Sequence, residues 1–127
     1  MAPGRVLVVE DDDGLRETLA EILADDGHEV RVASDGEAAL ETIEEWSPEI
    51  VVLDLMMPRM DGFAFRERQR DAEGARPPKL LLVSAARDVE TAAAELDADG
   101  WLFKPFGLQD VISSVRGLLE DRARPRT

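Results

Sequence analysis

Short apolar runs alternate along the chain with longer stretches of helical periodicity. Continuous apolar runs are typical of parallel strands that are buried on both faces. After each run, apolar residues recur at the three- and four-residue spacing of an amphipathic helix. Five such units in series predict an α/β domain with a parallel sheet and helices on both of its faces. The predicted strands are residues 6–9, 30–32, 50–55, 80–83 and 101–103.

Local signals predict where the first two helices begin and end. Asp12 or Asp13 can cap the first helix, and Gly27 can end it. Ser34 and Glu37 have the spacing of a capping box before the second helix. The apolar face of this second helix consists of Ala39, Leu40, Ile43 and Trp46.

The remaining helices differ in how clearly the pattern predicts them. The third follows Asp61-Gly62 and has almost no apolar stripe after Phe63 and Phe65. The fourth is a short segment that includes residues 92–96. The fifth has the clearest apolar face of the chain, formed by Leu108, Val111, Ile112, Val115, Leu118 and Leu119.

Composition narrows the class of protein. The 127 residues fit one domain, with a core at about 5–121 and a basic tail or linker start at 122–127. The net charge of −13 argues against a nucleic-acid surface, which needs clustered lysine and arginine. The absence of cysteine excludes disulfides and thiolate metal sites. The first apolar run is too short for a signal peptide or a membrane span, so we expect a cytoplasmic domain that does not enter the membrane.

Polar residues that could carry chemistry come directly after four of the predicted strands. Glu10 and Asp11 follow the first strand, and Asp54 comes near the end of the third. Ser84 follows the fourth strand and Lys104 follows the fifth. Ligands bind beyond the carboxyl ends of parallel strands, which share one edge of the sheet. In the strand order 2-1-3-4-5, the first and third strands are neighbours and their carboxylates face each other.

Each of these residues alone has an ordinary explanation, because acids often cap helices and a lone lysine is usually a surface charge. Carboxylates that are packed together repel one another, and a bound cation removes that cost. Oxygen ligands without histidine or cysteine favour Mg²⁺, with Mn²⁺ as the alternative. A site of this kind suits phosphoryl transfer, in which catalysis is mostly positioning and charge neutralisation.

The chain resembles the receiver domains of response regulators over about residues 5–121. Each motif alone is weak, but the set is highly specific in this order and spacing. The resemblance implies a flavodoxin-like, doubly wound sheet of five parallel strands in the order 2-1-3-4-5, with five helices. The motifs that carry it are Val6-Leu7-Val8-Val9-Glu10-Asp11-Asp12, Val51-Val52-Leu53-Asp54-Leu55-Met56-Met57-Pro58, Met60-Asp61-Gly62, Leu82-Val83-Ser84-Ala85 and Leu102-Phe103-Lys104-Pro105-Phe106.

The resemblance implies a role in phosphorylation for three residues. Asp54 would be the phosphoryl acceptor, with its carboxylate as the nucleophile. Lys104 would pair with a phosphoryl oxygen and stabilise charge in the transition state, and its bond to Pro105 is expected to be cis. Ser84 would form a hydrogen bond with the phosphoryl group after transfer. Trp101 would act with Ser84 as the aromatic switch residue.

The resemblance also implies a set of metal ligands. Asp11, Asp54 and the backbone carbonyl of Met56 would bind Mg²⁺ directly. Glu10 would contribute through a water molecule. These positions agree with the acidic residues that the strand ends bring together.

The implied function is that of a signalling switch, which catalyses only its own phosphorylation and dephosphorylation. Its donor would be a phosphohistidine on a sensor histidine kinase or a phosphotransfer protein. The fourth helix, fifth strand and fifth helix would contact a downstream protein, or a second copy of the chain in a homodimer. The only histidine, His28, comes just before the second strand, and we expect it to be a surface residue.

The chain departs from the family pattern in three places. The span from Ser84 to Lys104 is slightly short, which predicts a trimmed fourth helix. Arg66 and Gln69 stand in the third helix where the family tends to be apolar, so unusual packing is expected there. The switch position holds Trp101, where tyrosine or phenylalanine is commoner.

Two other classes of protein were weighed against the signalling switch. An aspartate-nucleophile phosphatase usually has a second acid two residues after the nucleophile. Met56 occupies that position and cannot donate a proton. A pseudo-receiver would bind partners without being phosphorylated, and the trimmed fourth helix is compatible with that alternative.

Overall fold

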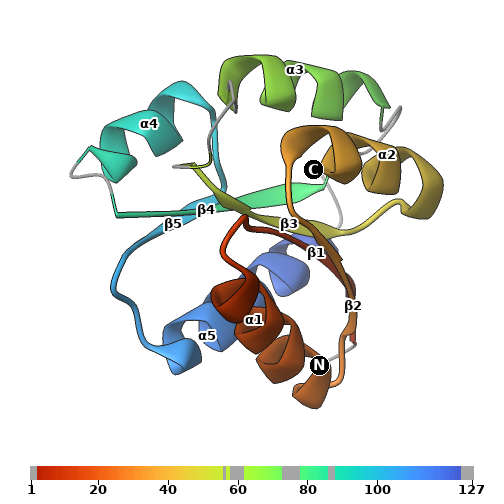
Figure 1. Cartoon of the computed structure of the whole chain (residues 1–127), viewed down its shortest axis with the longest axis vertical. Helices are drawn as coiled ribbons and strands as arrows, with labels where there is room; N and C mark the ends of the chain where they lie inside the picture. Colours follow the sequence, from red (N-terminus) through yellow and green to blue (C-terminus); the bar gives the residue numbers. More distant parts are fainter. Residues whose placement is uncertain (1–2, 56, 58–61, 73–77, 86–87, 124–127) are drawn as a thin grey trace.

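The protein forms a five-stranded sheet with helices on both faces (Figure 1). The computed structural model describes residues 3–55, 57, 62–72, 78–85 and 88–123. Strands and helices alternate along the whole chain, as the apolar pattern predicts. The elements are β1 (Arg5–Val9), α1 (Asp13–Asp25), β2 (Glu29–Ala33), α2 (Gly36–Trp46), β3 (Ile50–Asp54), α3 (Gly62–Ala72), β4 (Lys79–Ser84), α4 (Val89–Glu95), β5 (Gly100–Phe103) and α5 (Leu108–Ala123).

All paired strands run parallel, in the order β2-β1-β3-β4-β5, which confirms the expected fold. The central strand β3 is buried along its whole length, because it has a neighbour on each side and helices on both faces. Helices α2, α3 and α4 cover one face of the sheet, and α1 and α5 cover the other (Figure 1). Among the described residues, no helix is long and apolar enough to span a bilayer.

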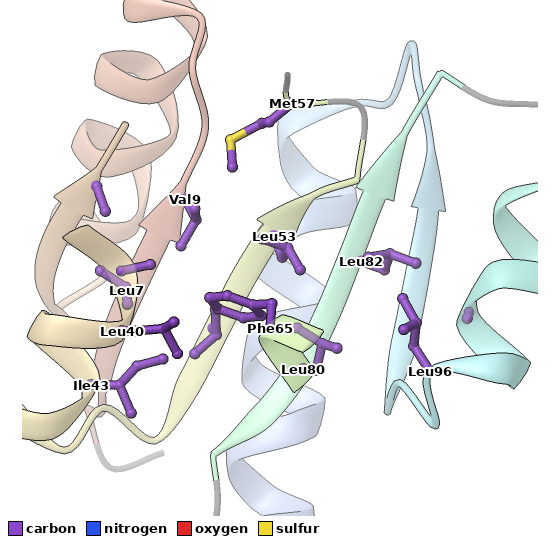
Figure 2. Packing of buried hydrophobic residues seen from close by; sticks show 14 of the residues in the cluster. Leu7, Val9, Leu40, Ile43, Leu53, Met57, Phe65, Leu80, Leu82 and Leu96 are labelled. Carbon is purple, nitrogen blue, oxygen red and sulfur yellow. The ribbon is translucent and has the colours of Figure 1, made fainter. Parts of the chain in front are cut away.

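The sheet separates two apolar cores, because successive strand residues point to opposite faces. Leu7, Leu53 and Leu80 point toward α2, α3 and α4, where Leu40 and Phe65 pack on them (Figure 2). The opposite face packs against α1 and α5. The buried residues of that second core include Val6, Val8, Leu19, Leu23, Ile50, Val52, Val111 and Val115.

The helix ends follow the predicted signals with one exception. Asp12 caps α1, and its carboxylate accepts a hydrogen bond from the Leu15 N–H at 2.8 Å. Gly27 follows the end of α1 with a φ of 97°, a conformation that glycine adopts without strain. The predicted capping box at Ser34 is wrong. Asp35 caps α2 instead, because its carboxylate accepts from the N–H of Ala38 at 2.8 Å.

The prediction that His28 is a surface residue is also wrong. Its side chain is buried, and its Nδ1 accepts a hydrogen bond from the Gly4 N–H at 3.1 Å. Its Nε2 lies 3.3 Å from the Asp26 carboxylate. The ring is therefore a structural link between the start of β1 and the end of α1, and a phosphocarrier role has no support.

Two of the family departures have visible consequences. Helix α4 has only seven residues, as expected from the short span between Ser84 and Lys104. Arg66 and Gln69 of α3 are buried, so these two polar residues of a weakly amphipathic helix face the interior. At the outer edge of the sheet, the third departure, Trp101 of β5, is 42% exposed.

Candidate functional site

Strand register brings the predicted site residues to one edge of the sheet. Leu53 pairs with Val9, so Glu10 and Asp54 follow at the carboxyl ends of neighbouring strands. On the other side of β3, Asp54 pairs with Val83, which precedes Ser84. Ser84 in turn pairs with Phe103, the last residue of β5. Lys104 therefore reaches the same edge from the next position.

The carboxylates and the lysine are in direct contact. The Lys104 Nζ lies 3.0 Å from an oxygen of Glu10 and 3.2 Å from an oxygen of Asp54. Ligand atoms of Glu10, Asp11 and Asp54 all lie within 4.8 Å of one another. Glu10 and Asp54 are buried, whereas Asp11 is exposed and gives solvent access to the cluster. Among the described residues, one ammonium group thus contacts two of the three carboxylates, Glu10 and Asp54.

The three consecutive aspartates that follow Glu10 have three different roles. Asp11 joins the cluster, Asp12 caps α1, and Asp13 forms an ion pair with Arg16 at 2.6 Å. Arg16 also donates to the backbone carbonyl of Glu10 at 3.0 Å and so fixes the loop that carries the cluster. Our sequence analysis missed Arg16, although the spacing from Asp13 is that of a helical ion pair.

Burial and close contact between charged groups shift the pKa values of Glu10 and Lys104. Burial, together with hydrogen bonding to Asp54, raises the pKa of Glu10 from 4.5 to about 7. Burial by itself would lower the pKa of Lys104, but its hydrogen bonds and charge contacts with Glu10 and Asp54 raise it instead. Lys104 is therefore a firmly protonated cation, and one carboxyl group of the cluster holds its proton near neutral pH.

The remaining predicted residues lie beside this cluster or outside the described chain. Ser84 is fully buried, and its backbone carbonyl accepts a hydrogen bond from the Lys104 N–H at 2.8 Å. The Lys104-Pro105 peptide bond is cis, as expected. Trp101 stands three residues before Lys104 on β5. Met56 lies outside the described residues, so its carbonyl stays a predicted ligand.

An apolar cleft that the sequence analysis did not identify lies next to Lys104. It has a volume of about 390 Å³. Lys104 is the residue that the cleft and the acidic cluster have in common. The cleft is lined by Leu15, Ala85, Lys104, Pro105, Phe106 and Leu108.

The donor set of the cluster fits a hard divalent cation. Its three carboxylates offer only oxygen ligands, the class that Mg²⁺ and Mn²⁺ prefer. The pKa of Glu10 is raised mainly by burial and also by its contact with Asp54, so the charged form of this carboxyl group is disfavoured without a cation. A divalent cation among Glu10, Asp11 and Asp54 would remove this repulsion.

Comparison with known proteins identifies the family. The family model described as "Response regulator receiver domain" matches residues 6–116. The chain is 42% identical over 119 residues to the "Response regulator MprA" of Mycolicibacterium vanbaalenii. It is also 42% identical over 124 residues to the protein of that name from Mycobacterium tuberculosis. These alignments cover 92% and 95% of the chain but 51% and 52% of the relatives, so the chain spans about half of their length.

Solved structures show the same fold. A receiver domain from Bermanella marisrubri is 31% identical, with a TM-score of 0.82, and the match covers 91% of this chain and 97% of that one. The receiver domain of the Francisella response regulator 1452 is 27% identical, with a TM-score of 0.81 and coverage of 93% and 98%. Vibrio cholerae chemotaxis protein CheY4 is 26% identical, with a TM-score of 0.79 and coverage of 92% and 99%.

Proposed function

The chain belongs to the family of response regulator receiver domains, and we propose that its phosphoryl acceptor is Asp54. Receiver domains are phosphorylation-controlled switches of two-component signalling rather than classical enzymes. The observation that carries the proposal is the contact of one lysine, Lys104, with both Glu10 and Asp54. Asp54 is the buried carboxylate at the end of the central strand, within reach of a cation and beside a cleft open to a partner.

The proposed reaction starts from a phosphohistidine on a sensor histidine kinase or a phosphotransfer protein. A carboxylate oxygen of Asp54 forms a bond to phosphorus while the bond from phosphorus to the imidazole nitrogen breaks. The electron pair of that bond stays on the imidazole, which takes up a proton from solvent. Lys104 stabilises the negative charge on the phosphoryl oxygens, and the Ser84 hydroxyl donates a hydrogen bond to the phosphorylated product.

Mg²⁺ is the proposed cofactor, with Mn²⁺ as a substitute. Asp11, Asp54 and the carbonyl of Met56 would bind it directly, and Glu10 would bind through water. Bound Mg²⁺ would neutralise charge on the phosphoryl oxygens and the carboxylates. The oxygen-only donor set, and the three carboxylates beside one lysine within the described part of the chain, support this assignment.

We further propose two surfaces through which the domain binds its protein partners. The apolar cleft beside Lys104 would receive the phosphodonor protein. The surface of α4, β5 and α5 would bind the downstream protein or a second copy of the chain. Exposed side chains of Trp101, Phe103 and Leu108 on that surface support this assignment.

The proposal is tested by intact mass after incubation with acetyl phosphate and Mg²⁺. One phosphoryl adduct is expected, and it should disappear with EDTA or in Asp54→Asn. Asp12→Asn is a matched control, because asparagine caps a helix as well as aspartate does and the adduct should persist. Asp11→Asn should reduce the adduct strongly. An adduct that persists in Asp54→Asn would exclude Asp54 as the acceptor, and no adduct in the unmodified protein would favour the pseudo-receiver.

A further inference from the structure

The buried guanidinium of Arg66 joins α3 to the C-terminal end of α4. Its Nη2 donates to the carbonyl of Asp97 at 2.7 Å, and its Nε donates to the carbonyl of Leu96 at 3.2 Å. Nη2 also lies 3.8 Å from the carboxylate of Asp99. The side chain is only 9% exposed. An arginine is well suited to this contact, because its planar fork can satisfy two carbonyls at once.

The segment that Arg66 contacts is also fixed to the sheet. Asp97 has a φ of 54°, the left-handed conformation, so the chain turns sharply after α4. The Asp99 carboxylate accepts a hydrogen bond from the Leu80 N–H at 2.8 Å and lies 3.5 Å from the Lys79 Nζ. The fully buried Gln69 accepts a further bond from Arg66 at 3.2 Å. Helix α3 and strand β4 therefore both contact the turn at residues 96–99, which joins α4 to β5.

The N-terminal end of α4 has no polar side-chain anchor of this kind among the described residues. Within the described residues, the Asp88 side chain makes no capping hydrogen bond, and its backbone is not in the extended conformation of a usual N-cap. Helix α4 has seven residues, of which Val89 and Ala93 are buried. Its N-terminal end comes soon after Ser84, at the edge of the sheet that carries the acidic cluster. The two ends of α4 thus differ in how strongly they are anchored.

We propose that Arg66 pins the C-terminal end of α4, so that phosphorylation moves this helix at its N-terminal end only. The trigger rests on the proposed function, but the pin is a property of the unphosphorylated protein. Ser84 responds to the phosphoryl group at one end of α4, and Arg66 fixes the other end. Helix α4 then tilts about Leu96 and Asp97 instead of shifting as a whole. Arg66 acts as a positioning residue.

Spin labels can measure the movement of each end separately. The chain has no cysteine, so labels attach only at introduced sites. One label at Glu90→Cys or Glu95→Cys, both exposed on α4, is paired with a reference label at Glu41→Cys on α2. With Mg²⁺ and beryllofluoride, a phosphoryl mimic, the 41–90 distance should change by roughly 2 Å, a common size for a helix shift. The 41–95 distance should stay constant.

Substitution of Arg66 should release the fixed end. In Arg66→Met the 41–95 distance distribution should broaden without the mimic and shift when the mimic binds. Arg66→Lys should give an intermediate broadening, because a single ammonium replaces the fork, and it provides a second variant if Arg66→Met does not fold. Arg68→Met, an exposed arginine on the same helix, is the matched control and should behave like the unsubstituted protein.

The outcomes separate this inference from the proposed function. The proposed anchoring of α4 by Arg66 would be overturned if the 41–90 and 41–95 distances changed equally. It would also be overturned if the 41–90 distance stayed the same with the mimic bound. An Arg66→Met distribution identical to that of Arg68→Met would overturn it as well. Failure of the unsubstituted protein to bind beryllofluoride would count against Asp54 as the acceptor. In that case the 41–95 distance distribution of Arg66→Met, measured without the mimic, still decides whether Arg66 fixes the C-terminal end of α4.

Discussion

Carboxylates at the two edges of the sheet differ in how their charge is paired. The amino edge is the one at which the parallel strands begin, and the carboxyl edge is the one at which they end. At the amino edge, three carboxylates each face at least one cation from another part of the fold. At the carboxyl edge, three carboxylates lie together, and within the described part of the chain Lys104 forms ion pairs with two of them, Glu10 and Asp54. The amino-edge groups are Asp26 with Arg116, Glu49 with Arg122, and Asp99 with Arg66 and Lys79.

The two edges also differ in the pKa of one carboxyl group at each, Asp26 and Glu10. The hydrogen bond from Arg116 lowers the pKa of Asp26, whereas burial raises the pKa of Glu10. A carboxyl group with a lowered pKa is a satisfied structural partner. A carboxyl group with a raised pKa is held in an environment that favours a proton or a cation. Asp26, paired with Arg116, is thus a structural ion-pair partner, whereas the buried Glu10 lies at the edge proposed for chemistry.

The two lysines of the chain give the sharpest test of this contrast, because one stands at each edge. Lys104→Ala should reduce phosphoryl incorporation at Asp54 about a hundredfold, the usual loss when one donor to developing charge is removed. Lys104→Arg should not restore full activity, because a planar fork does not replace a compact charge. Lys79→Ala should leave incorporation unchanged. Intact mass over time measures all three rates, and equal loss in both alanine variants would remove the distinction between the edges.

A second prediction concerns the pH dependence of stability without metal. The folded state raises the pKa of Glu10 from 4.5 to about 7, so its contribution to stability is present below 4.5 and lost as pH rises through about 7. Glu10→Gln does not titrate. It should therefore have nearly the stability of the unsubstituted protein in acid and be more stable at pH 8, by up to about 3 kcal/mol.

Urea unfolding in EDTA at several pH values measures this difference. Added Mg²⁺ should reduce it at pH 8, because the cation stabilises the charged cluster of the unsubstituted protein. A stability difference between the two proteins that stays constant with pH would show that Glu10 does not titrate in this range.

At the amino edge, substitution should affect stability and not phosphorylation. His28→Leu removes the acceptor for the Gly4 N–H, and an unpaired buried donor costs about 1–3 kcal/mol. His28→Asn can keep an acceptor near the position of Nδ1 and should be less harmful. Urea unfolding measures both. Phosphoryl incorporation per folded molecule should stay normal, and a loss of incorporation in folded His28→Leu would contradict the separation of the two edges.

The smallest expected effect is the response of Trp101 to activation. Its indole is 42% exposed on β5, and inward rotation should make it less accessible to a collisional quencher. The test uses a Trp46→Phe background, since Trp46 is the other tryptophan and stacks on Arg31. Beryllofluoride with Mg²⁺ should reduce quenching beyond the effect of Mg²⁺ alone. Unchanged quenching with the mimic bound would mean that Trp101 is only a packed residue of the edge strand.

Much of the fold and site could be predicted because the signals are local. The apolar runs identify each strand, and parallel pairing places every residue that follows a strand at one edge. Asp54 and Lys104 therefore come together although they are 50 residues apart. The strand order itself came from the family resemblance, since no local pattern distinguishes one order of parallel strands from another.

The features that sequence reasoning missed depend on contacts between distant elements. His28 looks like a polar residue before an edge strand, and only the packing of Gly4 and Asp26 around it makes it buried. Arg66 is one of several charged residues in a helix without an apolar stripe. Its partners lie 30 and 31 residues further along the chain. The family pattern marked position 66 as one that is usually apolar and predicted unusual packing there, but neither spacing nor composition could show the partners that Arg66 contacts.

The reach of Lys104 across the sheet also constrains the order of events during synthesis. Its two carboxylate partners precede it by 94 and 50 residues, so the charge balance of the cluster is complete only after β5 has paired with β4. A nascent chain that ends before Lys104 carries the proposed acceptor, Asp54, without the cation that is proposed to assist it. Signalling competence would therefore appear late, once almost the whole domain has left the ribosome, and incomplete chains would not compete for the phosphodonor.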